Sequence, residues 1–177
     1  MTGAAVLGRA ENTEYAPYYQ TYVSRVPDGD IVSILDDQMH ATAELLGGLN
    51  ESQGDYRYAE GKWSIKEMIS HVCDAERVFC YRALRFSRGD ETPLSSFDQS
   101  TWVPQSGANH RSLRDIADEF RAVRLATIAF ARSLTEEQVM RSGTASGYHV
   151  TVRGLLYIIA GHEAHHLAIL RDKYLRT

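Results

Sequence analysis

Cysteine is scarce in this chain of 177 residues. The two cysteines, Cys73 and Cys80, lie seven positions apart on one predicted helix, so their Cα atoms are about 10 Å apart and beyond disulfide reach. They form no C-x-x-C pair of the kind that serves metal or redox chemistry. We therefore expect both thiols to be reduced and packed.

The chain also lacks a long apolar run. The longest run, near residues 155–161, is far too short to span a bilayer, and residues 1–14 contain no apolar core of the length that a signal peptide needs. We therefore expect a cytoplasmic protein without a membrane partner.

No single sign of charge dominates the sequence. Lys and Arg number 19, Asp and Glu number 23, and the basic residues are scattered among acidic ones, so no patch for nucleic acid stands out. With 44% hydrophobic and 24% charged residues, the composition is that of a globular protein. We predict one domain over residues 1–177, with an extension over about residues 1–28 and a helical bundle over about residues 30–175.

Hydrophobic residues recur with the helical period almost throughout, and no stretch alternates as a half-buried strand would. The first helix should begin after Asp30, a good N-cap, and weaken at Gly47-Gly48. Ser64 and Glu67 form a capping box that starts the second helix, and Gly89 closes it. Residues 90–110 are predicted to be a long connection.

The remaining helices have equally clear starts. A third helix should begin at Ser112, and Thr135 should cap a much shorter turn. A Gly/Ser-rich loop through Gly143 and Gly147 then leads to a last helix between Thr151 and about Tyr174. Four long helices predict an all-α four-helix bundle.

The last predicted helix carries two histidines on its inner face. His162 and His166 are four residues apart and face the same way, so both could bind one metal ion, with hydrogen bonds to carboxylates or buried water as the alternative. His71 lies on the inner line of the second helix and could complete the site. Three imidazoles would leave positions open for water or substrate, as in catalytic sites.

The same run, G-H-E-A-H-H at residues 161–166, matches the H-E-x-x-H pattern of zinc peptidases, in which Glu163 would be the general base. That class needs a third ligand on the C-terminal side. No histidine follows His166, and the only acidic residue there is Asp172. A zinc peptidase is therefore the less favoured alternative.

Four stretches together resemble the DinB superfamily of YfiT-like metalloproteins. They are YAEGKWSIKE at residues 58–67, HVCDAER at 71–77, YRALR at 81–85 and GHEAHH at 161–166. The resemblance implies a bundle of up-down-down-up topology, commonly a homodimer, with nickel, zinc or another divalent ion bound by His71, His162 and His166. It also implies a small-molecule substrate, with transfer of a low-molecular-weight thiol, thiol-dependent isomerisation or hydrolysis as the reaction.

Several neighbouring side chains have two readings. His165 and Glu163 lie either beside the metal ligands or on the surface, and Asp74 either orients a ligand histidine or is solvated. Trp63 is expected to pack rather than to hold substrate. Three arginines of the second helix suit either an anionic substrate or an ordinary helix surface: Arg77, Arg82 and Arg85.

The leading hypothesis from the sequence is a metal-dependent enzyme in which a divalent ion, nickel or zinc, activates a thiol or water. The alternative from another class is a non-catalytic bundle whose histidines are structural or bind a metal that stabilises a dimer. The sequence names neither the metal nor the substrate, because three imidazoles suit several metals alike.

Overall fold

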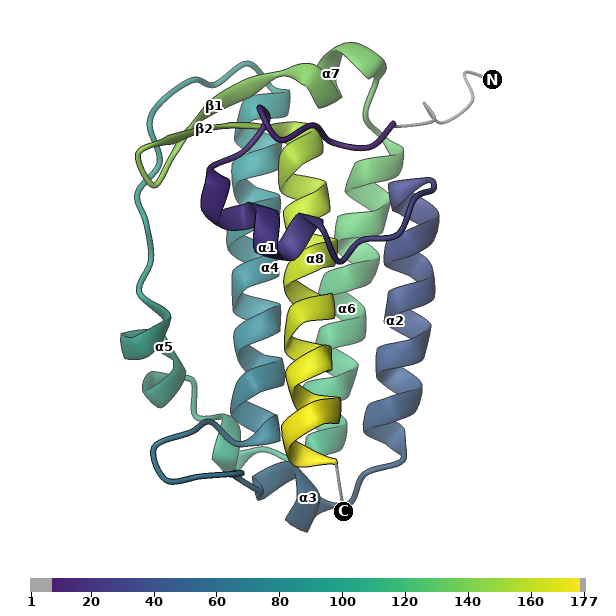
Figure 1. The fold of residues 1–177 in the computed structure, drawn as a ribbon, viewed down its shortest axis with the longest axis vertical. Helices are drawn as coiled ribbons and strands as arrows, with labels where there is room; N and C mark the ends of the chain where they lie inside the picture. The colour runs from purple at the N-terminus through teal and green to yellow at the C-terminus, as the bar shows by residue number, and fades with distance from the viewer. Residues whose placement is uncertain (1–7, 176–177) are drawn as a thin grey trace.

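Four long helices form the centre of the structure, a computed structural model that describes residues 8–175 (Figure 1). They are α2 (Ile31–Gly47), α4 (Ile65–Ser87), α6 (Leu113–Arg132) and α8 (Val152–Ile169). Helices α2 and α8 run in one direction and α4 and α6 in the other (Figure 1). This order confirms the predicted four-helix bundle and its up-down-down-up topology. Residues 1–7 and 176–177 of the predicted domain lie outside the described residues.

Each long helix starts where the sequence predicts. The side chain of the N-cap residue accepts a hydrogen bond from a backbone N–H of the first turn, and the N-caps are Asp30, Ser64, Ser112 and Thr151. In α4 the Glu67 carboxylate returns a bond to the Ser64 N–H, which completes the capping box. These bonds pair amide groups that a helix start otherwise leaves open.

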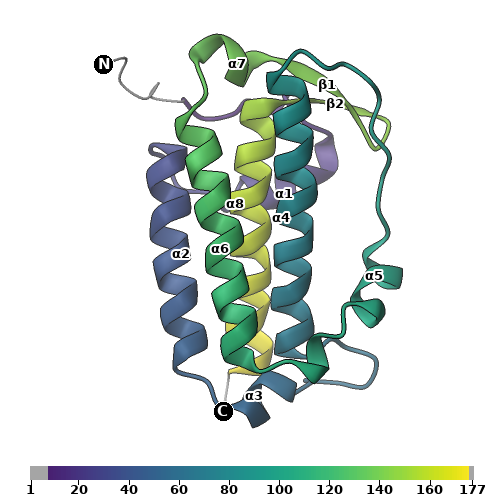
Figure 2. The same ribbon diagram turned by 180° about the vertical axis from the view of Figure 1, so that it is seen from behind.

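The long helices form a ring in which α4 packs against α6 and α8, and α2 against α6 and α8. Figure 2 shows α2, α6 and α4 side by side from behind. Within residues 8–175 no helix combines the length and hydropathy that crossing a membrane requires.

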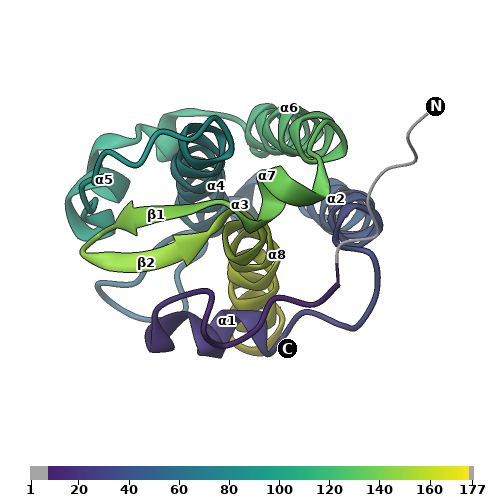
Figure 3. The same ribbon diagram turned by 90° about the horizontal axis from the view of Figure 1, so that it is seen from above.

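Helix α8 is buried on all sides over residues 154–163, because the N-terminal segment, residues 8–28, covers the side that the bundle leaves open (Figure 3). This segment contains the short helices η1 (Pro17–Tyr19) and α1 (Gln20–Val23). Two glycines of α8 permit the close approach. A Cβ on Gly161 would lie 2.3 Å from the Tyr22 carbonyl oxygen, and one on Gly154 would lie 2.8 Å from that of Glu14. The segment predicted as an extension therefore packs as a further layer.

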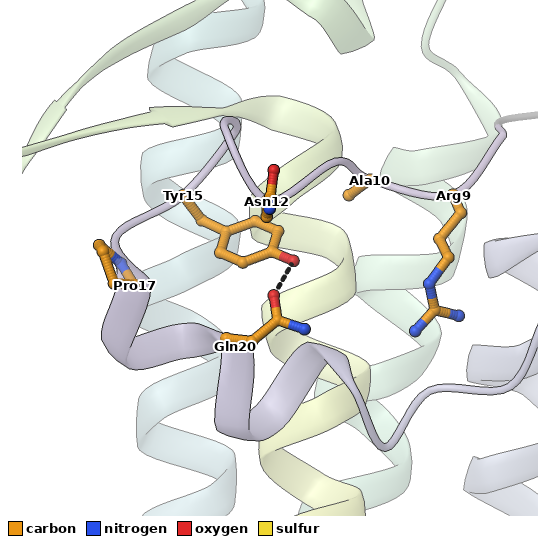
Figure 4. Close-up of a pocket in the computed structure, with 6 residues that line it drawn as sticks. All are labelled: Arg9, Ala10, Asn12, Tyr15, Pro17 and Gln20. Carbon is orange, nitrogen blue, oxygen red and sulfur yellow. Dashed lines mark hydrogen bonds between the residues drawn. The ribbon is translucent and has the colours of Figure 1, made fainter.

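The N-terminal segment is also tied down by polar bonds. Arg9 donates to the carbonyl oxygens of Val23 and Val26, and Tyr15 donates to Gln20. A surface pocket of about 520 Å³ lies in this segment, and none of the predicted metal ligands lines it. Figure 4 shows the residues that line it. Its lining residues are Arg9, Ala10, Asn12, Tyr15, Pro17 and Gln20.

The prediction of a loop through Gly143 and Gly147 is wrong in part, because residues 142–151 contain two short strands. A hairpin of β1 (Ser142–Ala145) and β2 (Tyr148–Thr151) stands where a loop was predicted, and it pairs Ser142 with Thr151. Ser146 and Gly147 turn the chain with φ values of 54° and 82°. Both residues thus have the positive φ of a tight hairpin turn. The strands were missed because four residues are too few to show the alternation of apolar and polar side chains that indicates a strand.

Short helices lie between the long ones. They are α3 (Glu51–Asp55), α5 (Gln99–Gln105), η2 (Ala108–His110), α7 (Glu136–Met140) and η3 (Leu170–Tyr174), a π-helical turn that follows α8. Thr135 caps α7 as predicted. The connection over residues 90–110 is more ordered than predicted, because α5 and η2 pack against α4 within it.

Candidate metal centre

The structure brings together the three histidines that the sequence singled out. His71 extends from α4, and His162 and His166 extend from α8, the antiparallel neighbour of α4. The Nε2 atom of His162 lies 3.1 Å from that of His71 and 3.1 Å from that of His166. Within residues 8–175, this is the one group of three or more His, Cys, Asp or Glu side chains arranged so that they could hold a metal ion.

All three imidazoles are buried, with 3%, 5% and 8% of His71, His162 and His166 exposed. Burial lowers the pKa of His71 to about 4 and that of His166 to about 3, and it holds the pKa of His162 well below its usual value. The rings are therefore neutral at pH 7. Neutral imidazole is the form that binds a metal ion.

The arrangement fits a metal ion better than it fits the histidines alone. A neutral imidazole nitrogen carries either one hydrogen or one lone pair, so three Nε2 atoms that face one another cannot all be paired by hydrogen bonds. A cation would accept a lone pair from each. Two nitrogens bound to one zinc ion at about 2.1 Å lie roughly 3.0–3.4 Å apart, and the two separations from His162, 3.1 Å each, fall in this range. All three candidate ligand atoms lie within 4.8 Å of one another.

Aromatic rings surround the histidines. The Tyr22 ring of α1 lies edge-on to His162 at 5.3 Å between centroids, and the Phe79 ring lies edge-on to it at 5.9 Å. Trp63, just before α4, lies 5.0 Å from the His71 ring. These rings exclude water from the sides that they cover. Trp63 packs as the sequence predicted, but it does so against a candidate ligand.

A pocket of about 250 Å³ reaches the site from the end of the bundle where α8 finishes. His166 forms part of its wall, together with Lys62, Trp63 and Tyr174. Of the three histidines only His166 lines this pocket, so the pocket meets the cluster at that residue.

Glu163 is neither a solvated residue nor an available general base. Its carboxylate accepts a hydrogen bond of 2.6 Å from the Thr42 hydroxyl and lies 2.5 Å from the Arg124 guanidinium. Arg124 is fully buried and also donates two hydrogen bonds to Glu76. The surface reading of Glu163 is wrong, because the side chain is 1% exposed. Its contacts with Arg124 and Thr42 engage the carboxylate that a general base would need free.

Sequence reasoning missed Arg124 and Glu76. The positions nevertheless carried a signal, since Arg124 lies four residues after the buried Phe120 and four before the buried Ile128. Glu76 likewise lies between Val72 and Phe79 on the inner line of α4. Opposite charges at inner positions of two neighbouring helices indicate a buried ion pair.

The remaining candidates lie away from the metal centre or beside it. Asp74 pairs with Arg77 at 3.5 Å, so its predicted role in orienting His71 finds no support in its contacts. His165 is half-buried with its ring 5.2 Å from that of His166, which places it beside the candidate ligands.

The three arginines of α4 are already engaged. Arg77 pairs with Glu119 and Arg85 with Asp90. Arg82 is buried and donates to the Ser95 carbonyl oxygen and the Ser146 hydroxyl, which joins the long connection to the hairpin.

Comparison with known proteins agrees with this geometry. A family model described as the DinB superfamily matches residues 34–170. The chain belongs to the DinB superfamily. The match contains all three histidines of the candidate site. It begins after the N-terminal segment, so the layer that covers α8 lies outside the part that defines the family match.

Three relatives are named "Putative metal-dependent hydrolase", and two of them illustrate the match. OB0413 of Oceanobacillus iheyensis is 27% identical over 130 residues, which cover 72% of this chain and 74% of the relative. YfiT of Bacillus subtilis is 21% identical over 166 residues, which cover 90% and 89%.

Two solved structures share the fold. YfiT, described as "a probable metal-dependent hydrolase with an unusual four-helix bundle topology", aligns with a TM-score of 0.72 at 19% identity over 80% of this chain and 82% of its own. A mycothiol-dependent maleylpyruvate isomerase aligns with a TM-score of 0.62 at 16% identity over 77% and 58%. At these identities the likeness establishes the fold of this DinB member alone.

Proposed function

We propose that this protein is a metal-dependent enzyme of the DinB type that acts on a small molecule. His71, His162 and His166 would hold a divalent ion, nickel or zinc, and the nucleophile would be a low-molecular-weight thiol or water. The convergence of three neutral, buried imidazoles on one point carries the proposal. A divalent ion supplies such a site with the ability to lower the pKa of a thiol or water molecule that it binds.

The chain's own residues prepare the site in three ways. Burial keeps the imidazoles unprotonated, so protons compete weakly for their nitrogens near pH 7. The rings of Tyr22, Phe79 and Trp63 keep water from the covered sides. The pocket beside His166 leaves one side open, which favours catalysis over a closed structural site.

The relatives' names support both nucleophiles that we consider. Three relatives carry the name "Putative metal-dependent hydrolase", and one structural neighbour is a mycothiol-dependent isomerase. The occupied carboxylate of Glu163 weighs against the zinc-peptidase alternative, which needs it as a free base. A homodimer and a cytoplasmic location stay predictions from the sequence.

Metal analysis tests the proposal most directly. The protein would be stripped with a chelator, reloaded separately with nickel and zinc, freed of unbound metal and analysed for metal per chain. We expect about one ion per wild-type chain, loss of that ion in His162→Ala and full retention in His149→Ala, which removes an exposed histidine of β2. Equal metal content in wild type and His162→Ala would remove the proposed site.

Activity assays then separate the two nucleophiles. The loaded protein would be given a small thiol with an electrophile such as monobromobimane, and separately a nitrophenyl ester. We expect turnover in one assay that falls to background in His162→Ala. If the metal-loaded protein transferred no small thiol to any electrophile, the thiol version would be abandoned in favour of water.

A further inference from the structure

The pocket beside His166 has a wall of aromatic and apolar side chains. Its volume of about 250 Å³ lies just below the range of most ligand pockets, so it suits a compact molecule and not a polypeptide. Five of its eight lining residues carry large, mainly apolar side chains: Tyr58, Trp63, Met68, Ile169 and Tyr174. Such a wall binds a flat, largely apolar body.

The wall is held in place by contacts among its own members. The Tyr174 hydroxyl donates a 2.7 Å hydrogen bond to the Trp63 carbonyl oxygen, and the Tyr58 ring lies edge-on to the Tyr174 ring at 4.9 Å. Gly61, with a φ of 72°, turns the chain just before Lys62 and Trp63. The pocket is therefore largely formed before any ligand enters.

Lys62 gives the pocket a positive charge. Its side chain is exposed and has no polar partner among the described residues, and no acidic side chain lines the pocket. The other cations nearby are neutralised: Arg57 pairs with Glu67, and Lys66 pairs with both Glu51 and Asp55. An anion that enters the pocket therefore meets one uncompensated ammonium group.

We propose that this pocket binds a small organic anion whose flat apolar body lies against the aromatic wall and whose carboxylate, or a similar anionic group, meets Lys62. Binding in this way places the rest of the molecule next to His166. The inference deepens the proposed function by naming the substrate class. It rests on that function for the reaction, but the binding itself requires only the pocket.

Nuclear magnetic resonance of the metal-free, full-length protein can test this inference. The chain has two tryptophans: Trp63 lines the pocket, whereas Trp102 packs against Phe97 outside it. Their indole N–H signals, assigned with Trp102→Phe, therefore serve as reporter and internal control. Benzoate and its neutral counterpart benzamide would be titrated separately at low ionic strength.

We expect benzoate to shift the Trp63 signal saturably, leave the Trp102 signal in place, and bind about fivefold more tightly than benzamide. The difference should disappear in Lys62→Gln and persist in Lys62→Arg. It should also persist in Lys173→Gln, which removes an equal charge from a lysine outside the pocket wall. A circular dichroism spectrum would confirm that each variant is folded.

Equal affinities for benzoate and benzamide, a shift of Trp102 instead of Trp63, or an unchanged preference in Lys62→Gln would each overturn the inference. The result is independent of the metal. Benzoate binding by a protein that retains no nickel or zinc would sustain the pocket and defeat the proposed function. Metal bound through the three histidines without a preference for benzoate would do the reverse.

Discussion

Replacing Glu163 by Gln should leave the free energy of unfolding at pH 7 within about 1 kcal/mol of the wild type, whereas Arg124→Met should lower it by about 3–5 kcal/mol. The two residues form one buried ion pair, and the expected asymmetry follows from their other partners. Arg124 also binds Glu76 through two hydrogen bonds of 2.9 and 2.8 Å and donates to the Leu35 carbonyl oxygen.

The magnitudes follow from what each change leaves behind. Without Arg124, the carboxylates of Glu76 and Glu163 stay in the bundle, 2% and 1% exposed, with no cation between them. Burial raises the pKa of Glu163, because a guanidinium shared with Glu76 only partly offsets the loss of hydration. Its folded pKa above the unfolded value means that ionisation costs stability as the pH rises. Gln resembles the protonated form and can keep the bond from Thr42.

Urea unfolding followed by circular dichroism measures both variants, and comparison of their slopes checks that the unfolded states are alike. For a chain of this length, the loss in Arg124→Met corresponds to a fall of roughly 6–20 °C in melting temperature. Metal content should be unchanged in Glu163→Gln. The reasoning is refuted if Glu163→Gln destabilises the protein as much as Arg124→Met.

Two further predictions concern the packing of α8 and the pH dependence of stability. Gly161→Ala should lower the free energy of unfolding by at least about 2 kcal/mol, because its Cβ would lie 2.3 Å from the Tyr22 carbonyl oxygen. Gly47→Ala, whose Cβ would meet nothing within 4 Å, should be neutral or slightly stabilising. Equal melting temperatures for the two variants would contradict this prediction. The metal-free protein should lose stability as the pH falls below about 6.5, the pKa of histidine in the unfolded chain. The unfolded histidines are protonated below that pH, whereas in the folded chain burial lowers the pKa of His71 to about 4 and that of His166 to about 3. His71→Gln should remove up to about 3 kcal/mol of that dependence in acid unfolding curves, and an unchanged curve would show that His71 is solvated.

The long helices were predictable because their start signals are local. Asp30, Ser64, Ser112 and Thr151 each cap a helix through a side chain that reaches only three residues along the chain. Such bonds depend little on the rest of the fold. The hairpin was not predictable in this way, because its short strands depend on pairing with each other and on the contact of Leu94 with Ala145.

The candidate site was predictable for a related reason. The spacing of His162 and His166 fixes a common face within one helix, and His71 needed only the assumption that α4 and α8 are neighbours. Access to the site could not be foreseen. It depends on Lys62 and Trp63, which follow a turn and meet the end of α8 only in the folded chain.

The buried charges show why an amphipathic pattern misleads in α8. A helix that is apolar on every side has no polar face, so Glu163 could not be assigned to core or solvent from spacing alone. The continuous apolar stretch over residues 155–160 is itself the clue, because a helix of that kind must be covered on all sides. In a four-helix bundle, complete cover requires a further layer, which the N-terminal segment supplies.

In the run from Gly161 to His166, the first three residues each have a packing partner that requires no peptidase chemistry. Gly161 admits the backbone of α1 at Tyr22, and Glu163 pairs with Arg124 on the side facing α2 and α6. Between these two contacts, His162 faces α4, where it meets His71. Gly161, His162 and Glu163 thus each meet a different neighbour of α8, and packing around one buried helix accounts for all three residues.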